Sequence, residues 1–306
     1  MGDIQNQFSW SFSRYRSFNL CKRQYYFSYY GYWGGWDTGA GEMEKTVYRL
    51  KKMMTVPMLV GALVHEMISR ILDSLRRERE MTLESAREGL IRRFKLRWRE
   101  SRRGEWKDNP KQKVNLFEHY YGEEMSEEDL LGVKKTMVDS MEGFYESDSY
   151  RFIRTLSPRQ WLTKEEMDSF DFEGTRVWVK LDFAARHGDK IYVYDWKTGK
   201  EVLEDETQLA TYGLYATKRW AIALDDLRLF DIYLKKRLPV KMKLNEAIVA
   251  SAQEVIRHSI EEMQQLLDDR LENRATMENF PMTDDTSLCR RCHFKGVCYP
   301  GTWKDL

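Results

Sequence analysis

The chain has 306 residues, which allows one large domain or two small ones. Hydrophobic residues make up 42% and aromatic residues 13%, so the chain can bury a sizeable core, which excludes the disordered class of proteins. Its longest apolar run, Met58–Val64, is far shorter than the ~20 residues that a membrane span needs. The net charge of +1 neither indicates nor excludes a nucleic-acid partner, because such footprints are local.

The four cysteines are too few for a disulfide scaffold, and they are unevenly placed, with one near the start and three near the end. No basic segment followed by an apolar one opens the chain, so we expect no signal peptide. We therefore expect a cytoplasmic, reducing location. Clustered thiols in such a compartment indicate metal binding or redox chemistry.

The first part of the chain predicts two helices. Residues 8–33 are rich in aromatic side chains, and Ser11 or Ser13 can cap a helix that runs through Cys21. Residues 34–56 indicate a glycine-containing connection. Apolar residues then recur every four positions from Leu59 to Leu75, which predicts a helix with one buried face.

Two further helices are expected at about 82–103 and 126–147, separated by a polar, loop-like stretch at 104–125. Residues 87–113 contain 11 Lys and Arg against 4 Asp and Glu. This local excess of charge indicates either a solvated helix face or a surface that follows a phosphate backbone.

After residue 150 the hydrophobic period becomes that of strands. Alternation at 177–181 and at 191–194 predicts two strands joined by a tight turn at 187–190. The remaining elements expected are strands at 161–167 and 227–234 and helices at 205–220 and 242–272. This order predicts an α/β (α+β) fold. Its expected parts are a core of 57–75 and 151–272, a helical insertion at 76–150, and terminal segments at 1–56 and 273–306.

A candidate catalytic cluster lies at the predicted strand ends. Asp195 and Lys197 are two apart on a strand, so their side chains share a face. Asp182 is as far from the tight turn as Asp195, so the two carboxylates can face each other. Hard cations such as Mg²⁺ or Mn²⁺ prefer carboxylate oxygens, and a nearby lysine can orient or activate water. The tripeptide Asp-x-Lys alone fits a solvated strand end better.

The wider pattern resembles the RecB-like branch of the PD-(D/E)XK nuclease superfamily. That branch has a helix with G-x-x-x-H, an Asp ending a strand, D-x-K-T-G, and Q-x-x-x-Y on a helix. The matching residues here, in the same order, are Gly61/His65, Asp182, Asp195-Trp196-Lys197-Thr198-Gly199 and Gln208/Tyr212. The 13-residue separation of the two aspartates is also typical of the branch.

The resemblance implies a restriction-endonuclease-like fold, a mixed central sheet flanked by helices. It also implies that His65, Asp182, Asp195 and the backbone carbonyl of Trp196 bind Mg²⁺ or Mn²⁺. Lys197 would then hold or deprotonate the attacking water, and Gln208 and Tyr212 would position the DNA strand. Glu165 and Glu166 lie outside this predicted ligand set, although either could approach the metal from its place on the preceding strand.

The cysteines extend the resemblance. Ser11-x-Ser13-Arg14 followed by Cys21 resembles the N-terminal motif of the iron–sulfur nucleases, with Lys22 where the family usually has proline. Cys289-x₂-Cys292-x₅-Cys298 matches their C-terminal ligand trio. The same layout occurs in AddB-type and CRISPR-associated RecB-like exonucleases, and it implies a structural 4Fe–4S cluster. A Cys₄ zinc site needs the same number of ligands, so the spacing alone leaves both metals open.

Together these patterns predict a metal-dependent DNA nuclease that acts on DNA ends or single strands, with other DNA-processing proteins as further partners and no membrane association. One alternative is a DNA-binding or assembly subunit whose nuclease site is idle. Another is a redox-sensing iron–sulfur protein, whose activity would change with the oxidation state of the cluster.

Overall fold

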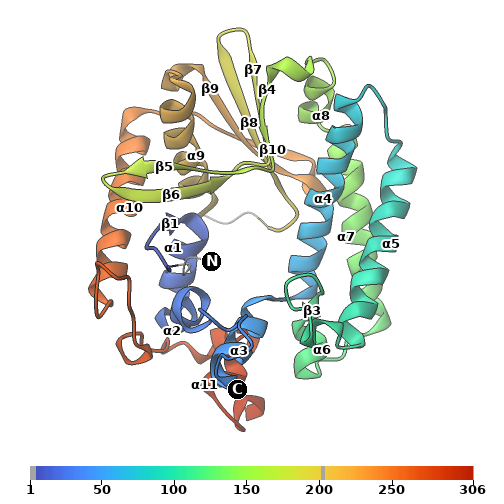
Figure 1. Cartoon of the computed structure of the whole chain (residues 1–306). Helices are drawn as coiled ribbons and strands as arrows, with labels where there is room; N and C mark the ends of the chain where they lie inside the picture. The colour runs from blue at the N-terminus through green and yellow to red at the C-terminus, as the bar shows by residue number, and fades with distance from the viewer. Residues whose placement is uncertain (1–4, 201–203, 306) are drawn as a thin grey trace.

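A five-stranded mixed sheet forms the centre of the computed structural model, which describes residues 5–200 and 204–305 (Figure 1). Its strand order is β10-β9-β8-β7-β4, in which β8 and β9 run parallel and the other neighbours antiparallel. The strands are β4 (Trp161–Lys164), β7 (Phe183–His187), β8 (Lys190–Lys197), β9 (Leu227–Tyr233) and β10 (Leu238–Met242). The mixed α/β class predicted from the sequence is confirmed.

Two smaller sheets accompany the central one. A three-stranded sheet has the order β1-β6-β5, and a two-stranded parallel sheet joins β2 to β3. The strands are β1 (Trp10–Ser11), β5 (Met167–Phe172), β6 (Thr175–Lys180), β2 (Met53–Met54) and β3 (Asn115–Leu116). Because β1 pairs with β6, the N-terminal segment is anchored to the middle of the chain.

Helices cover both faces of the central sheet (Figure 1). Val193 and Leu229 pack into one apolar cluster with α9 (Glu204–Trp220) and α10 (Glu246–Gln265). Trp196 and Ile232 point to the opposite face, because alternate residues of a strand point to opposite faces. The second face packs against α4 (Val56–Arg76), α5 (Leu83–Arg102), α7 (Glu127–Glu146) and α8 (Asp148–Ile153).

The C-terminal end of the chain lies at the bottom of Figure 1, against helices from the N-terminal part of the chain. The helices of this region are α1 (Phe12–Leu20), α2 (Lys22–Tyr26), α3 (Glu42–Lys51), α6 (Phe117–Tyr121) and α11 (Lys295–Cys298). The backbone N–H of Arg23 donates to the carbonyl of Pro281, and its side chain donates to the carbonyl of Phe280. Segments more than 250 residues apart in the sequence are therefore packed against each other.

The long helix α4 carries His65 into the centre of the molecule. The hydroxyl of Thr55 accepts a hydrogen bond from the backbone N–H of Met58 and so caps the first turn. A β-carbon at Gly61 would lie 3.2 Å from the hydroxyl oxygen of Thr198. The glycine of the G-x-x-x-H motif therefore lets α4 approach the loop that follows β8.

The strand pairing differs from the sequence prediction. The partner of β8 in the hairpin is β7, whereas Val177 and Val179 belong to β6 and the smaller sheet. The sequence pattern missed β7 because Ala184 and Ala185 give it few large apolar side chains. The register Phe183↔Tyr194 still places Asp182 opposite Asp195, as the equal spacing from the turn predicted.

Four predictions about helices and connections are also corrected. The helix expected through Cys21 is interrupted there, because that residue is extended and separates α1 from α2. The connection expected at 34–56 contains α3, whose Val47 and Leu50 are buried three residues apart. The helix expected at 242–272 ends at Gln265, and the polar stretch at 104–125 contains β3 and α6.

None of the helices in the described part of the chain has both the length and the apolar character that crossing a membrane requires.

We predict that Gly143→Ala destabilises the protein by about 1–3 kcal/mol, because α7 packs on the backbone after β9 with no room for a side chain. A β-carbon at Gly143 would overlap the carbonyl oxygen of Leu234. Gly132, in the same helix, has no atom within 4 Å of an added β-carbon, so Gly132→Ala is the matched control and should be neutral or stabilising. Thermal unfolding measures both, and equal melting temperatures would contradict this packing.

Candidate active site

Three potential metal ligands converge where α4 meets the bend between β4 and β5. The atoms offered by His65, Glu165 and Asp182 all lie within 4.8 Å of one another. His65 Nδ1 lies 3.1 Å from Asp182 Oδ1 and 3.4 Å from Glu165 Oε1. Among the residues that the structure describes, no other group of three or more such side chains is as compact.

Asp182 holds this group in place. It lies between β6 and β7 and is 5% exposed. Its Oδ2 accepts the backbone N–H of Trp196 at 2.7 Å, while Oδ1 faces His65. One buried carboxylate thus joins the beginning of β7 to the end of β8 and to α4.

Asp195 and Lys197 project together from β8, as the two-residue spacing predicted. Lys197 Nζ lies 2.8 Å from Asp195 Oδ2 and 3.8 Å from Asp231 Oδ1 on the parallel strand β9. It also donates a hydrogen bond to Gln208 Oε1 on α9. The hydroxyl of Tyr212, one turn further along α9, donates to Asp195 Oδ1 at 3.2 Å. These residues form one connected network beside the His65–Glu165–Asp182 group.

Burial and charge shift the titration of these groups in different directions. Burial alone would lower the pKa of His65, but Asp182 and Glu165 raise it well above its ordinary value. Burial opposes the ionised form of Glu165, yet His65 and Lys180 lower its pKa to about 2. Burial and the nearby charge of Asp182 raise the pKa of Asp195 to about 6, with Lys197 opposing them.

Glu165 is the site residue that the sequence pattern left outside the ligand set. It lies in the bend after β4, and its backbone N–H bonds the carbonyls of Leu181 and Asp182. Its φ of 56° is in the left-handed region, which side chains rarely adopt without a constraint. The neighbouring Glu166 is exposed. No periodic signal distinguishes the two glutamates, because a turn rather than a strand orients the first.

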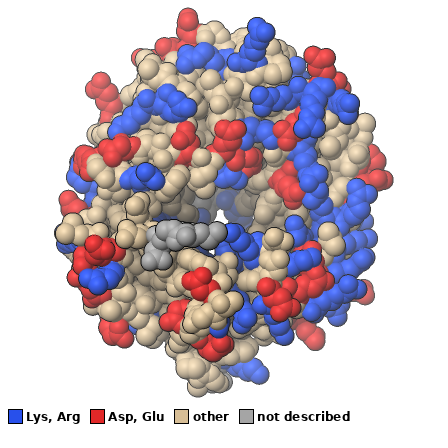
Figure 2. All heavy atoms as spheres, in the orientation of Figure 1, with Lys and Arg blue, Asp and Glu red and all other residues tan. Residues whose placement is uncertain are grey.

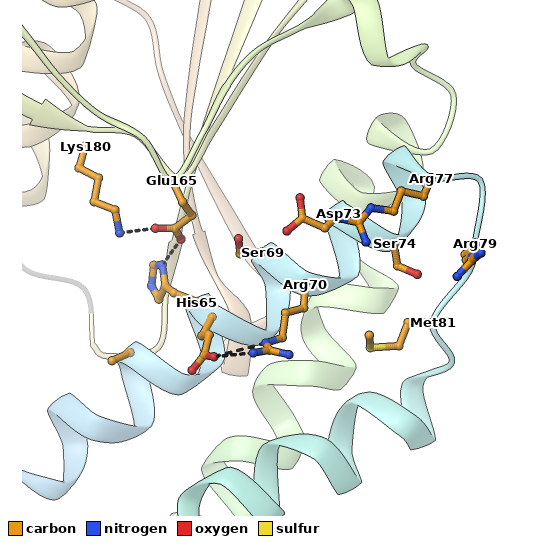
Figure 3. A pocket seen from close by; sticks show the side chains of 12 residues that line it. His65, Ser69, Arg70, Asp73, Ser74, Arg77, Arg79, Met81, Glu165 and Lys180 are labelled. Carbon is orange, nitrogen blue, oxygen red and sulfur yellow. Dashed lines mark hydrogen bonds and ion pairs between the residues drawn. The ribbon is translucent and has the colours of Figure 1, made fainter. Parts of the chain in front are cut away.

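A cavity of about 830 Å³ opens beside this site and follows α4 (Figure 3). Figure 3 shows His65 and Lys180 both pointing at Glu165, with Arg70 further along the helix. The lining residues are Ala62, His65, Glu66, Ser69, Arg70, Asp73, Ser74, Arg77, Arg79, Met81, Glu165 and Lys180. Figure 2 shows the molecule hollowed at its centre, in the region between α1 and α4. The candidate site is therefore accessible along α4.

The basic stretch at 87–113 divides into two parts in the structure. Arg93 forms an ion pair with Glu66 at 2.8 Å, and Arg97 and Lys113 pair with the buried Glu100. Arg87 pairs with Glu84 and Glu142, whereas Arg92, Lys95 and Arg99 line one shallow cavity of α5. Figure 2 shows many Lys and Arg side chains on that side of the molecule. Part of the excess charge is thus neutralised within the fold.

The four cysteines approach one another from opposite ends of the chain. Cys21 separates α1 from α2, Cys289 and Cys292 follow in the C-terminal turns, and Cys298 ends α11. All four are free thiols. Burial raises the pKa of Cys292 to about 12, and the other three thiols contribute to that shift. The segment that carries Cys21 therefore packs near the C-terminal turns: Cys292 Sγ lies 3.8 Å from Gln24 Oε1.

A family model described as the PD-(D/E)XK nuclease superfamily matches residues 9–299. The chain belongs to the PD-(D/E)XK nuclease superfamily. The members of this superfamily are nucleases that use divalent metals, and the mixed sheet flanked by helices agrees with their restriction-endonuclease-like fold. No curated protein matches the chain.

We predict that Mn²⁺ raises the melting temperature of the wild-type protein and that Glu165→Ala removes most of this shift. A ligand that binds the folded state stabilises it in proportion to the logarithm of its concentration over Kd. Glu166→Ala is the matched control, because its carboxylate is exposed and outside the compact group, and it should keep the wild-type shift. A full shift in Glu165→Ala would remove Glu165 from the ligand set.

Proposed function

We propose that this protein is a metal-dependent DNA nuclease of the RecB-like branch that hydrolyses phosphodiester bonds in single strands or at DNA ends. The observation that carries the proposal is the arrangement of the His65–Glu165–Asp182 group directly beside the Asp195–Lys197 pair. Membership of a nuclease superfamily supports it further.

The donor set suits a hard divalent cation. Carboxylate oxygens are the preferred ligands of Mg²⁺ and Mn²⁺, and His65 adds a nitrogen that Mn²⁺ accepts. We assign His65, Glu165, Asp182, Asp195 and the backbone carbonyl of Trp196 as the ligands. When bound, the metal neutralises charge on the transferring phosphoryl group.

Lys197 is the residue that holds or deprotonates the attacking water. Its ammonium is fixed between Asp195 and Asp231 and by the acceptor of Gln208, so it has little freedom to turn away. A fixed donor loses little orientation entropy when the water is bound. As an ammonium, Lys197 would hold the water by donating a hydrogen bond to it; as a neutral amine, it would accept a proton from the water and so form a hydroxide nucleophile and an ammonium group.

Gln208 and Tyr212 act as positioning residues for these groups. The contacts of Tyr212 are with Asp195 and the backbone carbonyl of Lys180, and its side chain is 5% exposed. Gln208 accepts a hydrogen bond from Lys197. Their contacts favour orientation of Asp195 and Lys197, whereas the sequence pattern predicted a direct role toward the DNA strand.

The lining of the cavity supports a nucleic-acid substrate. Arg70, Arg77 and Arg79 follow the same groove along α4, and Lys180 lies at its other end (Figure 3). Cations arranged in a row beside a metal site suit the successive phosphates of a strand. Asp73 and Glu66 also line the groove and reduce its net positive charge.

We predict that Lys197→Ala lowers the cleavage rate of a labelled linear single-stranded DNA in Mn²⁺ by at least ~10²-fold, the lower range for a lost proton-transfer group. Lys200→Ala changes an exposed lysine three residues away and should cleave at the wild-type rate. Binding of the same strand in EDTA should persist in both variants. Cleavage by purified Lys197→Ala at the wild-type rate would refute the assigned site, and an inactive wild type that still binds DNA would indicate the idle-site alternative.

We further propose that Cys21, Cys289, Cys292 and Cys298 hold a structural 4Fe–4S cluster. Four thiols from distant segments supply a complete ligand set. A Cys₄ zinc site would need the same four ligands. Iron is proposed because Cys21 and Cys289-x₂-Cys292-x₅-Cys298 resemble the ligand pattern of the iron–sulfur nucleases.

We predict that Cys21→Ser loses bound iron and brown colour, melts at a lower temperature and becomes protease-sensitive at both ends of the chain. The ligand bonds tie the N-terminal helices to the C-terminal tail, and metal binding of this kind is coupled to folding. Ser28→Ala, in the same segment and outside the ligand set, is the control. Stoichiometric zinc without iron after anaerobic purification would contradict the cluster. Cleavage that switches with the oxidation state of an intact cluster would instead indicate a redox sensor.

A further inference from the structure

Three cations gather on aromatic rings of the N-terminal region, away from the ligand group of the active site. The guanidinium of Arg14 on α1 lies 4.3 Å from the ring centre of Tyr29. Lys51 Nζ, at the end of α3, lies 3.2 Å from the ring centre of Tyr32 and 5.3 Å from that of Tyr29. Lys52 follows directly along the chain. We call Arg14, Lys51, Lys52, Tyr29 and Tyr32 the cationic–aromatic patch.

Among the described residues, the patch has no carboxylate partner. Within the described ranges, Arg14, Lys51 and Lys52 form no ion pair with a carboxylate. Arg14 is only 7% exposed, and its charge is met by the carbonyl of Ser9 and by aromatic rings. Burial and the charges of Lys52 and Arg14 lower the pKa of Lys51 to about 7. Partly desolvated cations that repel one another are stabilised when an anion binds between them.

The rings around the patch have the composition of a surface that binds single strands. Tyr32 stacks on Tyr48 with centroids 6.4 Å apart, and Trp36, 42% exposed, lies 5.9 Å from Tyr48. Lys52 Nζ lies 5.8 Å from the centre of the Tyr48 ring. Tyr48 is buried and Tyr29 and Tyr32 are half-buried, so Trp36 is the exposed ring of this group on which a base can stack. An acidic peptide would use the cations but would leave these rings without a role.

The patch is connected to the active site by the cavities. Lys52 lines a second cavity of about 240 Å³, together with Ala62 and Glu66 of α4. Ala62 and Glu66 also line the 830 Å³ cavity that contains His65 and Glu165. A strand that passes the active site can therefore continue toward Lys52 without leaving the surface of α4.

We propose that the cationic–aromatic patch is a second phosphate-binding site, at which Lys51 and Lys52 hold a phosphate of the nucleic-acid strand whose scissile bond lies at the active site, while the buried Arg14 adds positive charge behind them. This inference rests on the proposed nuclease function and specifies where the strand is held beyond the metal. The phosphate is either an internal phosphodiester or a terminal phosphate, since both present the same oxygens to the two lysines.

The test measures binding of a fluorescent deoxythymidine 20-mer in EDTA, where no cleavage occurs, over a series of KCl concentrations. Lys51→Gln with Lys52→Gln should weaken binding by ~10-fold or more at low salt. The slope of log K against log salt should flatten by about 0.7 for each phosphate of the single strand that the variant no longer neutralises. Lys190→Gln, at the exposed turn of the β7–β8 hairpin, is the matched control and should leave both quantities unchanged.

Comparison of 5′-phosphorylated and 5′-hydroxyl 20-mers, with inorganic phosphate as competitor, identifies which phosphate is held. A preference for the 5′-phosphate that disappears in the double variant assigns a terminal phosphate, and equal affinities assign an internal one. Amine acylation read by mass spectrometry gives an independent measure, because the 20-mer should protect Lys51 and Lys52 and leave Lys190 reactive. If Lys51→Gln fails to fold, Lys52→Gln alone is compared with Lys51→Arg. Lys51→Arg keeps the positive charge and should retain the wild-type salt slope, whereas Lys52→Gln should flatten it.

An unchanged salt slope in the folded double variant, with Lys51 and Lys52 still reactive in the presence of the 20-mer, would overturn the second phosphate site. If the wild-type protein cleaves DNA in that case, the proposed nuclease function stands and only this inference fails. A wild-type protein that neither binds the 20-mer nor cleaves DNA would refute both. Protection of the two lysines by an acidic peptide but not by the 20-mer would assign the patch to a protein partner.

Discussion

The arrangement of the active site depends on the two hydrogen bonds of Asp182. One carboxylate oxygen accepts the backbone N–H of Trp196 and the other faces His65. A buried acceptor that is removed leaves its donors unsatisfied, which costs about 1–3 kcal/mol for each group. Because Trp196 lies between Asp195 and Lys197, this bond also fixes the direction in which those two side chains leave β8. The ligand group and the water-activating pair therefore share one anchor.

Several ionisable side chains are buried around Asp182, which lowers the stability of the folded state. Asp182 and Asp195 lie close together, and the raised pKa of Asp195 reflects its burial and the charge of Asp182. The left-handed φ of Glu165 adds backbone strain at the same place. Such a cluster is tolerated in a fold when bound cations relieve the repulsion. The repulsion, the strain and the shape of the cavity all indicate a site prepared for a divalent ion.

The N-terminal region joins this site to the C-terminal end of the chain. Trp10 donates from its indole nitrogen to Ser259, and Tyr30 donates to Asn273, so α1 and the following turn are held against α10 and the tail. The same region carries Cys21 and the cationic–aromatic patch. A change in the segment around Cys21 would therefore disturb the surface that we propose holds the strand.

Local spacing in the sequence determined the long helices, the face shared by Asp195 and Lys197, and the opposition of Asp182 and Asp195 across a tight turn. These features follow from the regular repeat of side-chain directions along a helix or a strand, which can be read from a few neighbouring residues. Glu165 could not be predicted in the same way, because a left-handed bend between two sheets orients it. The packing of Arg23 against Phe280 and Pro281, and the assembly of the cationic–aromatic patch, were decided only by the tertiary structure. Each requires contacts between distant segments, and no local period of the sequence reports such contacts.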